Sequence, residues 1–222
     1  MGTLYLVRHG QASFGAEDYD QLSPLGIRQS MRLGEHFREL GLEWDAVITG
    51  TLRRHEQTWE NLARGMGCSV EPLKWPGLNE YDSTALIDTL HAVPSDPLTT
   101  SEGYRQHFRL LRDALRQWMA GVVSPKGMPS YEAFVNGVIS SLEHVRTHHQ
   151  GHVLMVTSGG PISTAVGHLL GTSPETTIEL NMRLRNTSVT ELQYNVKRHT
   201  LVSFNALPHL AQPPYQDWIT HA

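Results

Sequence analysis

Short apolar runs alternate with longer amphipathic stretches along the chain. Residues 4–7 (Leu-Tyr-Leu-Val) and 153–156 (Val-Leu-Met-Val) are continuously apolar. Such runs are typical of strands that are covered on both faces of a sheet. Four further strands are predicted, at 45–49, 68–73, 187–193 and 199–204.

Helical patterns separate these strands. The first helix is predicted from Ser23-Pro24 to about Leu40-Gly41, because serine caps helices and proline fits their first turn. Its apolar face is expected to comprise Ile27, Met31, Phe37 and Leu40. A second helix is predicted from an N-cap at Thr51 to about Gly65. Apolar spacing predicts others over 104–120 and 131–149, and Pro161 is expected to open one more.

This alternation predicts an α/β fold with a mainly parallel sheet sandwiched by helices and joined by right-handed crossovers. A chain of 222 residues can bury a full core within one domain, so we expect a single domain over 1–222. The proline-rich stretch at about 74–130 interrupts the pattern. We interpret it as an inserted helical cap over the active edge of the sheet.

Charge and composition exclude several classes of function. With 18 basic and 22 acidic residues the net charge is -4, which provides no basic field for nucleic acid or an anionic membrane. A single cysteine, Cys68, excludes an internal disulfide. No apolar run approaches the roughly 20 residues that span a bilayer, and the chain begins without a leader-like segment, so a cytoplasmic protein is expected. The 13 histidines show no HExxH spacing, so we expect neither a metal nor a cofactor.

The residues after the first strand suggest phosphoryl chemistry. Arg8 and His9 lie at the carboxyl end of that strand, where open α/β sheets bind ligands. Histidine can be a neutral nucleophile near pH 7, arginine matches phosphate oxygens, and Gly10 allows close backbone approach. The tripeptide alone also fits a strand that runs into an ordinary solvated loop. The rest of the sequence must therefore distinguish phosphoryl chemistry from an ordinary loop.

Five separated segments supply that context: LYLVRHGQAS at 4–13, LSPLGIRQS at 22–30, ITGTLRRHEQT at 48–58, LNE at 78–80 and VLMVTSGGPI at 153–162. Two more, LRNTSVTEL at 184–192 and FNALPHL at 204–210, follow in the same order. In these motifs the chain resembles the histidine phosphatase superfamily, also called the phosphoglycerate mutase-like family, over nearly its whole length.

The resemblance implies a role for four residues. His9 matches the nucleophile that takes up the phosphoryl group, and Arg8 matches a ligand of the phosphate oxygens. The second arginine of the pattern falls on Arg54 and leaves Arg53 as the free position. Glu80 matches the acid that protonates the leaving oxygen and then activates water, a dual role that a raised pKa supports.

The chain departs from the family pattern at Ser158. Where the family has a histidine before the glycine pair, this chain has Ser158 before Gly159 and Gly160, so the site loses a possible cation; Ser158 and Gly159 are expected to bind the phosphate. A hydroxyl still donates one hydrogen bond, but losing a preorganised donor costs about 100-fold to 1,000-fold in rate. Another histidine, such as His55, is an alternative occupant of that space. Gln11 and Ser13 are further candidates for binding the phosphate, or are ordinary loop residues.

Three hypotheses for function follow. The first is a phosphomonoester hydrolase that acts through a phosphohistidine and is slow or narrow in substrate. The second is a catalytically weak phosphate-binding or regulatory member of the family, and the third is a phosphoglycerate mutase. The expected partner is a small phosphorylated substrate whose identity the sequence does not specify, and a homodimer is left open.

Overall fold

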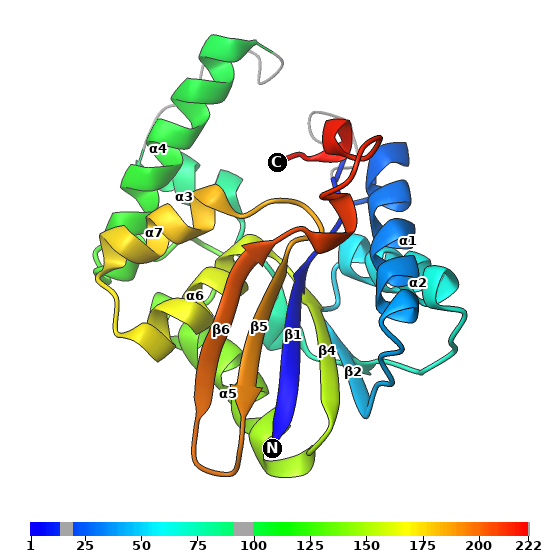
Figure 1. The fold of residues 1–222 in the computed structure, drawn as a ribbon. Helices are drawn as coiled ribbons and strands as arrows, with labels where there is room; N and C mark the ends of the chain where they lie inside the picture. The colour runs from blue at the N-terminus through cyan, green and yellow to red at the C-terminus, as the bar shows by residue number, and fades with distance from the viewer. Residues whose placement is uncertain (14–19, 91–99, 222) are drawn as a thin grey trace.

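The computed structural model describes residues 1–13, 20–90 and 100–221. A six-stranded sheet with the order β3-β2-β4-β1-β5-β6 lies at its centre (Figure 1). The strands are β1 Gly2–Arg8, β2 Ala46–Thr49, β3 Leu73–Lys74, β4 His152–Thr157, β5 Val189–Tyr194 and β6 His199–Ala206. β1 to β4 are mutually parallel, whereas β5 is antiparallel to both β1 and β6. The predicted mainly parallel sheet is confirmed.

Helices flank this sheet, and the five that the sequence pattern predicts occur in the expected order. They are α1 Pro24–Glu39, α2 Arg53–Met66, α3 Ser83–Leu90, α4 Ser101–Met119, α5 Tyr131–His148, α6 Gly159–Leu170 and α7 Pro174–Arg183. Short 3-10 helices occur at Pro76–Leu78, Pro208–Leu210 and Gln216–Trp218. In Figure 1, α1 and α2 lie to the right of the sheet, and α5 and α6 lie towards its other side.

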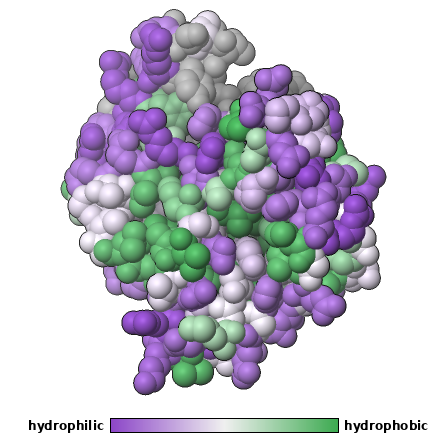
Figure 2. All heavy atoms as spheres, in the orientation of Figure 1, coloured by the Kyte–Doolittle hydropathy of each residue, from purple (hydrophilic) through white to green (hydrophobic). Residues whose placement is uncertain are grey.

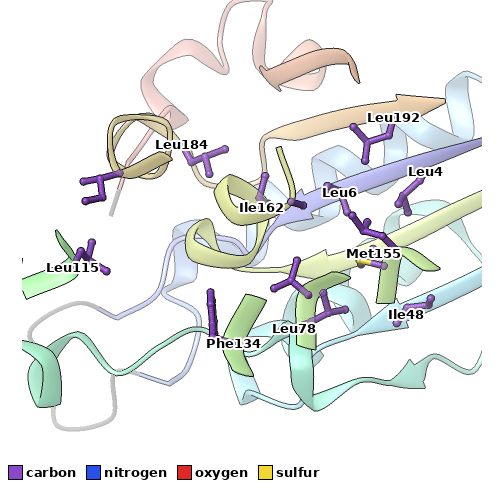
Figure 3. Packing of buried hydrophobic residues seen from close by; sticks show 14 of the residues in the cluster. Leu4, Leu6, Ile48, Leu78, Leu115, Phe134, Met155, Ile162, Leu184 and Leu192 are labelled. Atoms are coloured by element: carbon purple, nitrogen blue, oxygen red, sulfur yellow. The ribbon is translucent and has the colours of Figure 1, made fainter. Parts of the chain in front are cut away.

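Two hydrophobic clusters, one on each face of the sheet, hold these layers together. Leu4 and Leu6 of β1 pack with residues of α5 and α6, whereas Val7 packs with α1 and α2. The first cluster extends from the sheet to Leu115 of α4 and Phe134 of α5 (Figure 3). Because successive side chains of a strand point to opposite faces, β1 is buried on both sides. Its carboxyl end is therefore rigidly placed.

The face that α1 buries differs from the predicted one. Ile27 and Leu40 are 37% and 59% exposed, so they do not face the core. The buried residues are instead small or polar for the most part, namely Gly26, Gln29, Ser30, Leu33, Gly34 and Phe37. A Cβ atom on Gly34 would lie 2.1 Å from the carbonyl oxygen of Leu62 in α2. The two helices approach so closely here that only a small residue fits, while Leu33 and Phe37 pack with Trp59 and Leu62 of α2 in the same hydrophobic cluster.

Several predicted boundaries were wrong for local reasons. The strand expected at 68–73 is only Leu73–Lys74, because Cys68 and Val70 pack against the core without joining the ladder. The N-cap of α2 is Leu52, not Thr51. Helix α6 begins two residues before Pro161, which a first turn tolerates because its N–H groups have no intrahelical acceptor. Helices α3 and α7 were not predicted.

The segment predicted as a cap contains α3 and α4, and its residues 91–99 lie outside the described ranges. Helix α4 packs against α3 and α7 at the upper left of Figure 1. Hydrophobic side chains gather across the middle of the face shown in Figure 2, and hydrophilic ones surround them. Among the described helices, none is long and apolar enough to cross a membrane. That this segment acts as a cap stays a prediction.

Candidate active site

His9 follows the last residue of β1, between β4 and β5. Its backbone N–H donates to the carbonyl of Thr157 at 2.8 Å, which continues the parallel ladder one residue beyond the Arg8–Thr157 pair. The side chain is only 3% exposed. The imidazole is therefore held by the end of a doubly covered strand and not by a solvated loop.

The hydrogen bond of the imidazole fixes its tautomer. Nδ1 lies 2.7 Å from the carbonyl oxygen of Gly10. Because a carbonyl oxygen only accepts hydrogen bonds, Nδ1 must carry a proton. Burial, followed by the positive charges of Arg54 and Arg8, holds the pKa of His9 well below its usual 6.5. The ring is thus neutral at pH 7, and Nε2 keeps its lone pair for attack.

Arg54 lies in the first turn of α2 and is bound by a carboxylate. Its Nη1 donates to Oδ1 of Asp20 at 2.7 Å. The same carboxylate accepts the backbone N–H of Arg53 at 2.9 Å, so it also caps the helix. Arg54 is buried, whereas the Arg53 side chain is exposed. This difference agrees with the choice of Arg54 over Arg53 as the site residue.

Arg8 joins the end of β1 to the C-terminal part of the chain. Its Nη1 donates to the carbonyl of Leu184 at 2.6 Å and also to the carbonyl of His221. In Figure 1 the C-terminal segment, in red, lies above the upper end of β1. These contacts fix the guanidinium beside His9.

Glu80 sits against the start of α6. Both carboxylate oxygens accept the N–H of Gly160 at 3.1 Å. A Cβ atom on Gly160 would lie 2.1 Å from Oε1, so only glycine permits this approach. Thr157 Oγ1 donates to the carbonyl of Leu78 at 2.6 Å and ties the loop before Glu80 to β4. Burial raises the pKa of Glu80, with the Gly160 N–H opposing the shift.

Ser158 pairs with a histidine behind the site. Its Oγ lies 2.6 Å from Nε2 of His55, and both side chains are fully buried. The rings of His55 and His9 are 5.8 Å apart between centroids. Burial, with the nearby charges of Arg54 and Lys74, lowers the pKa of His55 well below 6.5. His55 is therefore neutral and supplies no cation.

Of the eight predicted site residues, four line the same pocket. A pocket of about 400 Å³ is lined by Arg8, His9, Arg54 and Glu80. Of the described residues, the predicted phosphate ligands Gln11, Ser13, Ser158 and Gly159 are not among those that line it. Their role in binding phosphate stays a prediction.

The side chain of Gln11 is already engaged with α1. Its Oε1 accepts a hydrogen bond from Ser23 Oγ at 2.8 Å, and its backbone N–H donates to Gln29 at 2.9 Å. The backbone N–H of Ser13 donates to the carbonyl of Gln21 at 2.9 Å. These bonds order the loop that follows His9.

Sequence reasoning missed several residues of the pocket. Asp20 follows a polar loop and had no readable signal. Tyr81 and Asn181, whose side chains are hydrogen-bonded at 2.7 Å, come from segments 100 residues apart. His107 and Phe108 of α4 were considered only as parts of a helix. Within the described ranges, no group of three or more His, Cys, Asp or Glu is arranged to hold a metal ion.

Comparison with known families decides the membership of the chain. A family model for the histidine phosphatase superfamily (branch 1) matches residues 4–207. The chain belongs to the histidine phosphatase superfamily. The resemblance seen in its motifs is thereby confirmed.

Members of this superfamily with differing names resemble the chain. "Putative phosphoserine phosphatase 2" of Hydrogenobacter thermophilus is 27% identical over 223 residues, which cover 96% of this chain and 99% of that protein. "Probable phosphoglycerate mutase GpmB" of Escherichia coli is 29% identical over 201 residues, covering 86% of this chain and 84% of that protein.

A solved structure shares the fold. Phosphoserine phosphatase from Entamoeba histolytica, in complex with 3-phosphoglyceric acid, matches with a TM-score of 0.67 and 21% identity, covering 95% of this chain and 100% of that chain. At this identity the likeness concerns the fold alone.

The pair of His55 and Ser158 yields a test of the site geometry. We expect Ser158→His to destabilise the protein by about 1–3 kcal/mol, because a second imidazole would overpack a fully buried position. Adding His55→Ala should recover most of that loss, because it empties the space beside residue 158. Urea unfolding of the wild type, both single variants and the double variant measures this coupling. Strictly additive effects would show that the two side chains do not share one space.

Proposed function

We propose that the protein is a phosphomonoester hydrolase that acts through a phosphohistidine on His9. One observation carries the proposal: a buried, neutral imidazole whose Nδ1 is bound to a carbonyl lines a pocket together with Arg8, Arg54 and Glu80. Nucleophile, cations and proton donor are the three components that phosphoryl transfer through a covalent intermediate needs. The family membership and the phosphatase name of one relative agree with it.

In the first step, Nε2 of His9 attacks the phosphorus atom and forms an N–P bond. The bond between phosphorus and the ester oxygen breaks, and Glu80 gives its proton to that oxygen, so that a neutral alcohol leaves. Arg8 and Arg54 stabilise the charge on the equatorial oxygens. A carboxyl whose pKa is raised by burial is suited to hold this proton.

In the second step, the Glu80 carboxylate takes a proton from water while the water oxygen attacks the phosphorus. The N–P bond breaks, its electron pair returns to Nε2, and inorganic phosphate leaves. Glu80 ends the cycle protonated and His9 neutral, so both groups are ready for another turnover.

Ser158 stands, in this proposal, where the family pattern has a second histidine. The buried hydroxyl bonds to His55, which is neutral, so neither residue contributes a positive charge to the phosphate. Loss of one preorganised donor costs about 100-fold to 1,000-fold in rate. The protein would then be a slow phosphatase or one that is narrow in substrate. Gln11, Ser13 and Gly159 remain candidate donors of backbone or side-chain hydrogen bonds to the phosphate.

A second function, phosphate binding with little turnover, is favoured by the ion pair of Asp20 with Arg54. The carboxylate already holds Nη1 of Arg54 at 2.7 Å, so a phosphate must share or displace it. A regulatory member that senses phosphate could use this competition. A phosphoglycerate mutase is supported by the names of several relatives and of one solved structure.

Turnover of 4-nitrophenyl phosphate distinguishes these functions. We expect slow hydrolysis that His9→Ala abolishes and that Arg54→Ala reduces by about 100-fold or more, because the cationic clamp is lost. Arg53→Ala, the matched control on the neighbouring exposed arginine, should leave the rate within about twofold. A chelator should not change the rate, because the clamp consists of arginines.

Absence of hydrolysis above the His9→Ala background would reject the enzyme in favour of the binding protein. A rate that collapses with chelator and returns with added metal would contradict the mechanism.

The pH dependence of the hydrolysis rate tests whether His9 acts as the nucleophile and Glu80 as the acid. Because the pKa of His9 is lowered, the nucleophile should stay neutral at pH values below 6.5. Because the pKa of Glu80 is raised above 4.5, the acid should stay protonated further up the pH scale than an ordinary carboxyl, and the rate should fall as pH rises through that pKa.

This profile is best measured as kcat with an alkyl phosphate, whose leaving oxygen needs the proton. Glu80→Gln should lower kcat by about 100-fold or more and remove the alkaline fall. Ionisation of the substrate itself would persist in both profiles. If Glu80→Gln keeps an alkaline fall in kcat beyond the one caused by ionisation of the substrate, the proton comes from another group.

A further inference from the structure

We infer that the substrate is the phosphate ester of a largely apolar alcohol or phenol that carries no second anionic group, and not of a hydroxy acid. The inference rests on the proposed phosphatase activity and concerns the part of the substrate beyond the phosphate. The distribution of charge along the pocket carries it.

The cations of the pocket are gathered at its reacting end. Among the described lining residues, Arg8 and Arg54 are the only arginines, and there is no lysine. Both flank His9, where the phosphate dianion needs them. The segments 14–19 and 91–99, which lie outside the described residues, contain neither lysine nor arginine in their sequence. Among the described residues that line the pocket, no lysine or further arginine is therefore left for a second anionic group; Arg183 and Arg185 act on the lining residue His221 but are not themselves part of the lining.

The two other histidines of the lining do not fill this role. Burial lowers the pKa of His107 below 6.5. Burial also lowers the pKa of His221, helped by the charges of Arg185, Arg8 and Arg183. Both imidazoles are neutral at pH 7. They can donate a hydrogen bond to a neutral oxygen but cannot pair with a carboxylate as a cation.

The acidic residues of the lining add repulsion. Asp20 and Asp82 both line the pocket. Asp20 is paired with Arg54, and Asp82 accepts the N–H groups of Thr84 and Ala85 at 2.9 Å and 3.0 Å at the start of α3. A substrate carboxylate would thus lose water without gaining a partner, which is a costly exchange.

Ser83 and Thr84 at the start of α3 add polar groups to the lining, but much of the remaining wall is apolar and comes from two helices and the loop beyond one of them. Phe108 and Leu111 of α4 face the pocket together with Met182 of α7 and Leu184. Tyr81, braced by Asn181, adds an aromatic ring with a polar edge. A pocket of about 400 Å³ is within the size range of small-molecule sites, which are mostly apolar with a few placed polar groups. An aliphatic or aromatic body matches this wall.

Phosphoserine and 3-phosphoglycerate, which feature in the names of related proteins, both carry a carboxylate. We expect both to be poor substrates here.

A matched pair of probes isolates the charge: 3-carbamoylphenyl phosphate and 3-carboxyphenyl phosphate, which have nearly the same size. We expect kcat/KM to favour the neutral amide by about tenfold or more. His107→Arg places a cation among the lining residues, so it should shift this ratio towards the carboxylate. The two probes differ in leaving-group chemistry. Comparing their kcat/KM ratio between the wild type and His107→Arg cancels most of this difference, because it is common to both proteins.

Binding of the two probes to the His9→Ala variant, measured by isothermal titration calorimetry, tests the inference without depending on turnover. Tighter binding of the amide, with the preference reduced in His9→Ala/His107→Arg, supports it. Equal or tighter binding of the carboxylate overturns it, whether or not the wild type hydrolyses either probe. Failure of both probes to turn over while the binding preference holds would instead count against the proposed hydrolysis.

Discussion

The hydrogen bond from Nδ1 of His9 to the carbonyl of Gly10 constrains the chemistry of the whole site. It uses one ring nitrogen and leaves Nε2 as the only nitrogen able to act as a nucleophile. Burial keeps the ring neutral, so all positive charge for an anionic ligand must come from arginine. This explains why Arg8 and Arg54, brought from β1 and α2, line the same pocket as His9.

Two charged groups of the site, Arg8 and Glu80, are restrained by hydrogen bonds to the backbone. Arg8 is bound to the carbonyls of Leu184 and His221, and Glu80 rests on the N–H of Gly160. Such restraint reduces the reorganisation that a reaction requires. Arg54 differs because its partner is the carboxylate of Asp20, a group with the same sign of charge as a phosphate. Substrate affinity should therefore depend on how the two anions share one guanidinium.

The sequence predicted the sheet well because continuous apolar runs determine which strands are buried on both faces. It failed for α1, where the close approach at Gly34 makes small residues the buried face and leaves Ile27 exposed. It also missed α3, although Asp82 provides a capping signal for a helix of eight residues. Such features depend on tertiary contacts more than on local pattern.

The site was predictable where family motifs fall, at Arg8, His9, Arg54 and Glu80, all of which line the pocket. Asp20 and His107 could not be predicted, because their position depends on how loops and α4 meet above the sheet. The contact of His55 with Ser158 was considered only as an alternative, since residues 103 positions apart gave no pairing signal. A single sequence does not show which side chains become neighbours when they are far apart along the chain.

The most direct test of the proposed mechanism is to trap the covalent intermediate. The enzyme is mixed with a phosphate monoester, quenched within milliseconds in alkaline denaturant, and digested for mass spectrometry. We expect one phosphoryl group on the peptide that contains His9, stable in alkali, lost in acid, and missing from His9→Ala. Phosphate on a different residue, or steady turnover by His9→Ala, would contradict it.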